Sequence, residues 1–178
     1  IRDRTRSRGL GDVYKRQDIC LKDAECISLI RKAGGLLIGH TNMTELAYSG
    51  LGINPHYGTP LNPIYKGAIP GGSTSGGAVS ISLDISDITI GTDTGGSTRI
   101  PAAFTGITGF KPTQDVISRK GVLVLSSSLD SVGLMAKNVE LCRLGYEVMK
   151  NKTNIKKTNL YDKEANLIIP TNFGFEDI

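Results

Sequence analysis

Two clusters of glycine, serine and threonine constrain this chain more than any other feature. Residues 69–77 read IPGGSTSGG, and residues 91–104 read GTDTGGSTRIPAAF. Flexible Gly/Ser linkers are polar throughout, whereas apolar runs follow both of these clusters closely. Each cluster is therefore expected to form a tight turn that opens a buried element, and the presence of two such turns needs a chemical explanation.

Helix and strand patterns alternate on either side of the two turns. We expect strands over 36–39, 87–91, 107–110, 131–136 and 167–170. We expect helices over 23–33, 78–83, 99–104 and 138–149, and a proline-rich surface loop over 49–70. Such alternation favours an α/β fold, with helices packed on a largely parallel or mixed sheet.

Several residues mark the expected ends and faces of the helices. Gly34 and Gly35 are typical of a helix C-cap, and Asn138 is a typical N-cap for the last helix. Asn42 followed by Glu45 has the spacing of a capping box, which predicts a further helix start there. The last helix is expected to bury a stripe of three residues, Leu141, Leu144 and Val148.

The net charge of +4 belongs to one short segment. Residues 1–17 hold six basic and two acidic residues, and the basic and acidic residues of the remaining chain balance. The segment has almost no apolar content, which is typical of a disordered basic arm, and it also resembles a translated sequencing adapter. We therefore interpret 1–17 as non-native or disordered, and we expect one domain over 18–178 with no nucleic-acid partner.

The cysteines and histidines do not predict a metal site. Cys20, Cys26 and Cys142 are odd in number and form no CxxC pair, and the only histidines are His40 and His56. No apolar run reaches the roughly 18 to 20 residues that a membrane span needs, and the N-terminal residues lack the apolar core of a secretory signal. We expect a cytoplasmic protein with reduced thiols, without metal or cofactor and without a membrane partner.

Three familiar chemistries of glycine-rich turns do not fit these sequences. A Walker phosphate loop needs Gly-Lys-Ser/Thr and a dinucleotide loop needs GxGxxG, and neither pattern occurs. The α/β-hydrolase elbow needs GxSxG, which Ser73, Ser75 and Ser97 all lack. His40 and His56 lie on segments that do not favour a Ser-His-Asp triad. What remains is a serine activated by a neutral lysine, an arrangement in which a second hydroxyl can relay the proton.

The run GGSTSGG…GTDTGGSTRIPAAFTGITGFKPT closely resembles the central signature of the amidase signature family, the Ser-cisSer-Lys amidohydrolases. The resemblance extends over 18–178 and includes the stretch HTNMTELAYSGLGINPHYGTPLNP. It implies the amidase-signature fold, with a mixed sheet core flanked by helices, of which this chain holds the central part. It also implies a small-molecule amide substrate, hydrolysed to acid and ammonia or amine through a serine acyl-enzyme.

The resemblance assigns one serine of each turn to catalysis. Ser97 matches the nucleophile, and Ser73 matches the relay serine, which in this family follows a cis peptide bond, here after Gly72. Ser97 lies 24 residues after Ser73, which matches the family's spacing and favours Ser73 over Ser75.

The resemblance also implies roles for the residues near the nucleophile. The backbone N–H groups from Thr94 to Ser97, with Thr94, Gly95 and Gly96 as substrate-binding residues, would donate hydrogen bonds to the substrate carbonyl oxygen as it becomes an oxyanion. Ala47 matches a segment that lines the acyl pocket. Asp93 and Arg99 flank the nucleophile turn, either as support for it or as an ordinary surface pair.

The family's base lysine has no match here. It is expected at a strand end well upstream of the serine turns, at or before the start of this chain. Lys22 precedes Asp23, as the family's lysine precedes an aspartate, but it is too close to Ser73 and lies at a helix start. We therefore expect a fragment of an amidase that keeps the nucleophile and the relay, lacks the base, and is inactive as given.

Two other interpretations stay open. The chain can derive from the A subunit of a glutamyl-tRNA amidotransferase, which shares the signature and works with partner subunits on glutamine and charged tRNA. It can also be a non-catalytic, decayed homologue, for which the missing lysine is the support. The stretches GVLVLSSSLDSVG and GLGINPHYGTP favour a stand-alone amidase, for which a homodimer is a compatible assembly.

Overall fold

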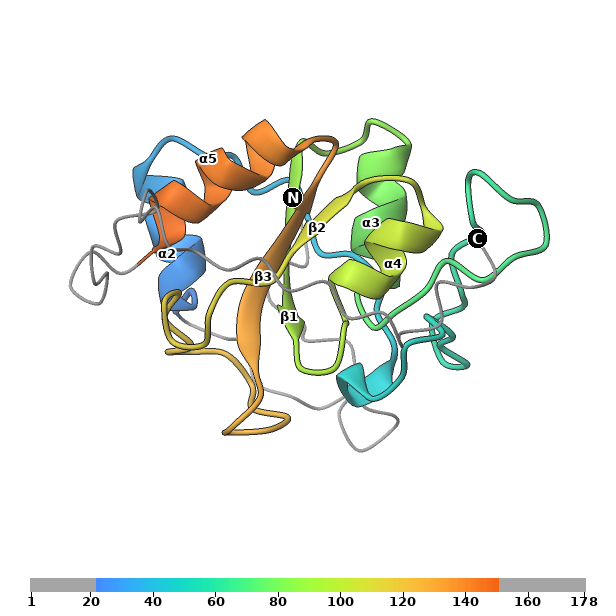
Figure 1. Cartoon of the computed structure of the whole chain (residues 1–178), viewed down its shortest axis with the longest axis horizontal. Coiled ribbons are helices and arrows are strands. Elements are labelled where there is room, and N and C mark those ends of the chain that lie inside the picture. Colours follow the sequence, from blue (N-terminus) through green and yellow to red (C-terminus); the bar gives the residue numbers. More distant parts are fainter. Residues whose placement is uncertain (1–21, 151–178) are drawn as a thin grey trace, which may run out of the picture.

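A three-stranded sheet separates two pairs of helices in the computed structural model, which describes residues 22–150 (Figure 1). The strands are β1 (Ile88–Asp93), β2 (Thr108–Phe110) and β3 (Ser131–Ala136), in the order β1-β3-β2. The helices are α2 (Glu25–Lys32), α3 (Ser75–Ser82), α4 (Arg99–Phe104) and α5 (Val139–Met149), with a short 3₁₀ helix, η1 (Glu45–Ala47).

Strand β3 forms the centre of the core, and all six of its residues are buried. Successive side chains of a strand point to opposite faces. One face carries Val132, Leu134 and Ala136, which pack with residues of α2 and α5. On the other face Met135 packs with Ala residues of α3 and α4. Residues of a strand covered on both faces are therefore apolar or small throughout.

Both pairings of the described sheet are antiparallel. Strand β1 pairs with β3 from Ile88 opposite Ala136 to Asp93 opposite Ser131, and β2 pairs with the other edge of β3. The α/β class with helices on both faces agrees with the expectation. The parallel pairs of a mixed sheet are not among these three strands.

Most of the expected elements are confirmed. Strands β1, β2 and β3 cover the segments expected near 87–91, 107–110 and 131–136, and α2, α3, α4 and α5 cover the expected helices. Helix α2 ends as expected, because Gly34 and Gly35 donate to the carbonyls of Arg31 and Ile30, the two bonds of a Schellman cap. The Asn138 side chain accepts from Leu141 N–H and caps α5.

The buried strand expected over 36–39 is wrong. This segment has no regular secondary structure, and Leu36 is 85% and Ile38 62% exposed. A strand needs a neighbour for its N–H and C=O groups. Within 22–150 no segment pairs with these residues, so their apolar pattern by itself does not produce a strand.

The capping box at Asn42 and Glu45 is also wrong. Thr44 takes the N-cap position of the short η1, while the Asn42 side chain donates to the Gly58 carbonyl and accepts from the next N–H. Leu46 has a φ of 56°, a left-handed conformation that no α-helix continues. The asparagine therefore fastens the proline-rich loop instead of starting a helix.

The buried stripe of α5 differs from the expected one. The helix buries Cys142, Gly145 and Met149, whereas Leu144 is 55% exposed. The expected and the observed buried residues both have helical spacing, but the face that packs on the sheet is the one that carries Gly145. A side chain at Gly145 would approach Leu134 and Ile88, so glycine allows the helix to lie close to the strands.

Three expectations lie outside the described residues: the interpretation of 1–17, the state of Cys20, and the strand over 167–170.

Gly133 provides a test of this packing. A Cβ at Gly133 would lie 2.9 Å from the Phe110 carbonyl oxygen and 2.9 Å from Thr98 Oγ1. Gly133→Ala is expected to lower the free energy of unfolding by about 1–3 kcal/mol, because overpacking a buried site forces its neighbours to move. Chemical denaturation followed by circular dichroism measures the change. At Gly39 an added Cβ meets nothing within 4 Å, so Gly39→Ala is the control, and equal effects of the two variants would contradict the described packing.

Candidate active site

The two serine turns lie against each other. The Thr74 N–H donates to the carbonyl oxygen of Ser97 at 3.2 Å. A Cβ at Gly71 would lie 2.8 Å from the Pro101 Cα, so the absence of a side chain lets the first turn approach α4. Ser73 and Ser97, which the sequence places in separate turns, are therefore brought together.

Ser73 is held in a fully buried position. The Gly72–Ser73 peptide bond is cis, as the resemblance implies. The Ser73 carbonyl accepts from the N–H groups of Thr44 and Ser75, at 2.8 and 2.9 Å. Its side chain is 0% exposed, and its hydroxyl has no hydrogen-bond partner among the described residues. Buried hydroxyls are normally hydrogen-bonded, so this one has unused capacity to donate or accept, as have those of Thr44 and Ser75.

The backbone before Ser97 is an open turn. Gly96 has a φ of 135°, a conformation that favours glycine, and its carbonyl accepts from the Ile100 N–H at 2.7 Å at the start of α4. In the part of the chain that the structure describes, the N–H groups of Gly95, Gly96 and Ser97 donate to no protein acceptor. Ser97 itself is 9% exposed. The turn thus combines a serine hydroxyl with several unpaired backbone donors.

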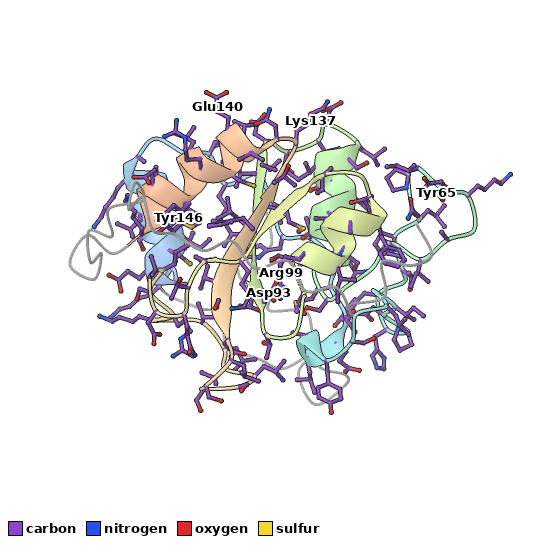
Figure 2. The ribbon with its side chains drawn as sticks, viewed as in Figure 1. Tyr65, Asp93, Arg99, Lys137, Glu140 and Tyr146 are labelled. Atoms are coloured by element: carbon purple, nitrogen blue, oxygen red, sulfur yellow. The ribbon has the colours of Figure 1, made fainter. Side chains whose placement is uncertain are left out.

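Asp93 connects the two ends of this turn. Its carboxylate is fully buried and accepts two hydrogen bonds from the Arg99 guanidinium, at 3.0 and 2.9 Å. The N–H and the hydroxyl of Thr98 donate to the same carboxylate, at 3.2 and 2.9 Å. Figure 2 shows the Asp93 and Arg99 side chains next to each other beside α4. Since Asp93 is 0% exposed, the alternative of an ordinary surface pair is wrong.

The hydrogen bonds decide the charge of Asp93. Burial alone would raise the pKa of this carboxyl, but the bonds from Arg99 and Thr98 outweigh it and hold the pKa below its ordinary value. Bonding to Asp93 in turn raises the pKa of Arg99. The site therefore contains a buried anion with a matched, half-exposed cation.

Ala47 lies in a segment that is fastened to the Ser73 turn at two points. The Thr44 N–H donates to Ser73, and the Gly72 N–H donates to the Gly50 carbonyl at 2.7 Å. Between these bonds Ala47 is partly exposed and has a φ of 58°. This residue therefore lies beside the turn that carries Ser73.

Sequence reasoning missed three residues that organise the site. Thr98 bonds to Asp93, Asp130 accepts from the Thr94 hydroxyl at 2.6 Å, and Asn62 donates to the carbonyls of both Ile69 and Phe104. Asp130 directly precedes a fully apolar or small-residue strand, which is a weak signal of a buried polar role. The Asn-Pro pair at Asn62 predicts only an ordinary turn, and no sequence pattern predicts the bonds from Asn62 to the Ile69 and Phe104 carbonyls.

The lysines of the described residues have other partners or are exposed. Lys111 donates to Ser131 at 3.0 Å, and Lys137 and Lys150 pair with acidic residues. Lys22 is exposed. Over 22–150 no lysine bonds to the Ser73 hydroxyl.

Neither a metal cluster nor a spanning helix is found in this region. Among the residues described, no three His, Cys, Asp or Glu side chains are grouped to hold a metal ion. No helix within the same ranges is both long and apolar enough to cross a membrane.

Burial raises the pKa of the Cys26 and Cys142 thiols, and both are free.

Comparison with known proteins gives consistent matches. The family model described as Amidase matches residues 11–171. The chain is 42% identical over 130 residues to Amidase 1 of Arabidopsis thaliana. It is 41% identical over 136 residues to the mitochondrial Outer envelope protein 64 of the same plant. The crystal structure of the A subunit of the glutamyl-tRNA(Gln) amidotransferase from Thermotoga maritima superposes with a TM-score of 0.75 at 29% identity.

These matches cover most of the chain but only part of each relative. The aligned regions comprise 73%, 76% and 80% of the chain in the three comparisons. The chain spans 31% of Amidase 1, 23% of the outer envelope protein and 31% of the amidotransferase protein.

The Asp93 carboxylate predicts a specific acid response. Asp93→Asn is expected to lower the free energy of unfolding by about 1–3 kcal/mol at neutral pH, because the neutral amide cannot replace the charged acceptor of four hydrogen bonds. The half-exposed Arg99 that is left behind can be solvated. Folding lowers the pKa of Asp93 below its unfolded value of about 3.9. Its stabilising contribution is therefore complete well above that value and is lost as the pH falls through the folded pKa. Denaturation curves collected between neutral and acidic pH should show a smaller acid loss in the variant than in the unsubstituted chain.

The matched control is Asp115→Asn, which removes an exposed carboxylate paired with Arg119. Exposed pairs contribute about 0–1 kcal/mol, so this variant should follow the unsubstituted chain. An Asp93→Asn variant with unchanged stability and an unchanged acid response would show that the buried pair does not stabilise the turn.

Proposed function

Since this chain belongs to the amidase family, we propose that Ser97 is the nucleophile of an enzyme that hydrolyses carboxylic amides through an acyl-enzyme. The Ser97 Oγ attacks the amide carbonyl carbon, and the C–N bond then breaks to release ammonia or an amine. Water hydrolyses the resulting serine ester and releases the carboxylic acid. Ser73 relays the Ser97 proton to the base and, by the return path, to the leaving nitrogen.

One observation carries this proposal: a serine with unpaired backbone donors lies against a second, buried serine whose hydroxyl has no partner among the described residues. The N–H groups of Gly95, Gly96 and Ser97 would stabilise the oxyanion of the tetrahedral intermediate. Such donors act most strongly where water is largely excluded, and Ser97 is only 9% exposed. In this proposal Asp93 and Arg99 fix the turn, and Ala47 lines the acyl side of the pocket.

The general base comes from outside 22–150 in this proposal. Its support is the buried Ser73 hydroxyl, which bonds to no described lysine. A neutral lysine contacting Ser73 would complete the relay. Residues 22–150 would then hold the nucleophile and the relay without the base.

A second candidate function is that of the A subunit of an amidotransferase. The likeness to the Thermotoga maritima protein supports it. On this candidate the same serines would release ammonia from glutamine for a partner protein, and hydrolysis of glutamine would require that partner.

Substitution of the two serines tests the roles assigned to them. In the full-length gene product, Ser97→Ala is expected to lower kcat at least about 10³-fold, because removing a nucleophile leaves only binding and oxyanion stabilisation. Ser73→Ala should lower kcat about 10²- to 10⁴-fold through loss of proton transfer. Release of ammonia from a panel of primary amides and glutamine measures both effects.

Ser75→Ala is the matched control for the relay, because the Ser75 hydroxyl is also buried and without a partner among the described residues. It should cost less than Ser73→Ala. Full activity of Ser97→Ala would refute the nucleophile, and a larger loss at Ser75 would transfer the relay to that residue. Turnover of glutamine only with partner subunits would favour the second candidate, and no turnover of any amide would favour a decayed homologue.

The 178-residue chain itself is expected to show no amide hydrolysis, because no lysine within 22–150 bonds to the Ser73 hydroxyl and the proposal places the base outside this chain. The same ammonia assay, with the full-length gene product as the positive control, measures this. Turnover by the 178-residue chain that Ser97→Ala abolishes would show that the base lies within the printed sequence.

A further inference from the structure

The nucleophile turn is held by side chains and not by its own N–H groups. The N–H groups of Gly95, Gly96 and Ser97 are unpaired among the described residues. Asp93 fixes the side of the turn that leads into α4, through Thr98 and Arg99. Thr94, the first residue of the turn after β1, makes none of the bonds to Asp93, so the direction of the backbone there depends on a further contact.

Asp130 supplies this contact. The Thr94 hydroxyl donates to Asp130 Oδ1 at 2.6 Å, a short bond of the kind that charged acceptors make. The same carboxylate accepts from the N–H groups of Leu125 and Ser126, at 2.8 to 3.0 Å. Asp130 is 3% exposed, so both of its oxygens are bonded and shielded from water.

The sheet register places Asp130 at the required position. Ser131 is the partner of Asp93 at the end of the β1–β3 ladder. Asp130 and Thr94 are the next residues outward on the two strands, so the carboxylate comes opposite the start of the turn. The Ser131 hydroxyl also accepts from Lys111 at 3.0 Å. Lys111 directly follows β2, so this bond holds the same end of β3 from the β2 side.

We propose that Asp130 is a positioning residue, which acts through the Thr94 hydroxyl to set the direction of the backbone donors before Ser97. The inference rests on the proposed function of that turn, since the donors matter for catalysis only if Ser97 is the nucleophile. Two carboxylates then hold the turn: Asp93, the last residue of β1, bonds to Thr98 and Arg99 at the start of α4. Asp130, which precedes β3, bonds to Thr94. The backbone N–H groups between them stay available for the substrate oxygen.

A role in the 125–130 loop alone is the competing explanation. Asp130 closes that loop by accepting from Leu125 and Ser126, which a merely structural carboxylate would also do. Thr94 separates the two explanations. Thr94→Val removes the hydroxyl without touching the loop bonds of Asp130, whereas Thr94→Ser keeps a hydroxyl at the same position.

The test compares amide signals of the ¹⁵N-labelled 178-residue chain by NMR. Thr94→Val and Asp130→Asn are both expected to shift or broaden the signals of Gly95, Gly96 and Ser97. Thr94→Ser should leave these signals close to their original positions. In Thr94→Val the signals of Leu125 and Ser126 should stay in place, because their acceptor is intact.

Asp84→Asn is the matched control, since it removes an exposed carboxylate that pairs with Lys137 at the opposite end of the same ladder. It should not move the Gly95–Ser97 signals. Unchanged signals in Thr94→Val would overturn the inference, as would equal changes in Thr94→Val and Thr94→Ser. If Asp130→Asn does not fold, the two Thr94 variants still decide the question.

A binding measurement in the full-length gene product relates the position of the donors to chemistry. Phenylboronic acid forms a tetrahedral adduct with a nucleophilic serine and places an oxygen where the oxyanion would lie. Its affinity should fall about tenfold to a hundredfold in Thr94→Val and Asp130→Asn, because small misplacements of a site are costly. Thr94→Ser should retain it. Equal affinity in all variants would overturn the inference, whereas no adduct in the unsubstituted protein counts against the proposed function and leaves the NMR comparison to decide.

Discussion

The buried carboxylate of Asp93 determines the geometry of the region around it. A charged group without water is tolerated only when it is paired and fully hydrogen-bonded, and Arg99 and Thr98 meet that need with four bonds. Asp93 is the last residue of β1 and its partners begin α4, so this interaction joins the two ends of the turn between them. Because the pKa of Asp93 is held low, the interaction is present at neutral pH.

The rest of the site follows from having a turn that side chains hold in place. Its N–H groups need no protein partners, and glycines keep its backbone free of side chains that would cover them. The Ser73 turn approaches because Gly71 allows contact with Pro101, and the Thr74–Ser97 bond connects the two turns. Ser97, the buried Ser73 and unpaired backbone donors then lie on two adjacent turns, an arrangement that suits the proposed acyl transfer.

Local sequence patterns predict much of this arrangement. The features that they do not predict depend on contacts between residues far apart in the sequence. The helix cap at Gly34 and Gly35 and the cap at Asn138 were predictable because their bonds lie within a few residues. The conformation of the segment 36–39 could not be predicted in this way, because a strand depends on a neighbouring strand that its own residues do not identify. The long family signature predicts that Ser73 and Ser97 belong to one site. No local pattern predicts the bond between Asp130 and Thr94, because these residues lie 36 positions apart in the sequence. Leu144 has the helical spacing of a core residue but is exposed, because helical periodicity predicts the spacing of a buried face more reliably than the direction in which that face points.

The role of Ser97 as nucleophile can be tested by identifying the residue that carries the acyl group during turnover. The full-length gene product is mixed with an amide that it hydrolyses, quenched in acid, digested and examined by mass spectrometry. The proposed mechanism predicts a mass increase equal to the acyl group, located by fragmentation on Ser97 and absent from Ser73. An acyl group on any other residue, or turnover without an acylated peptide under conditions that trap serine esters in a known serine amidase, would contradict it.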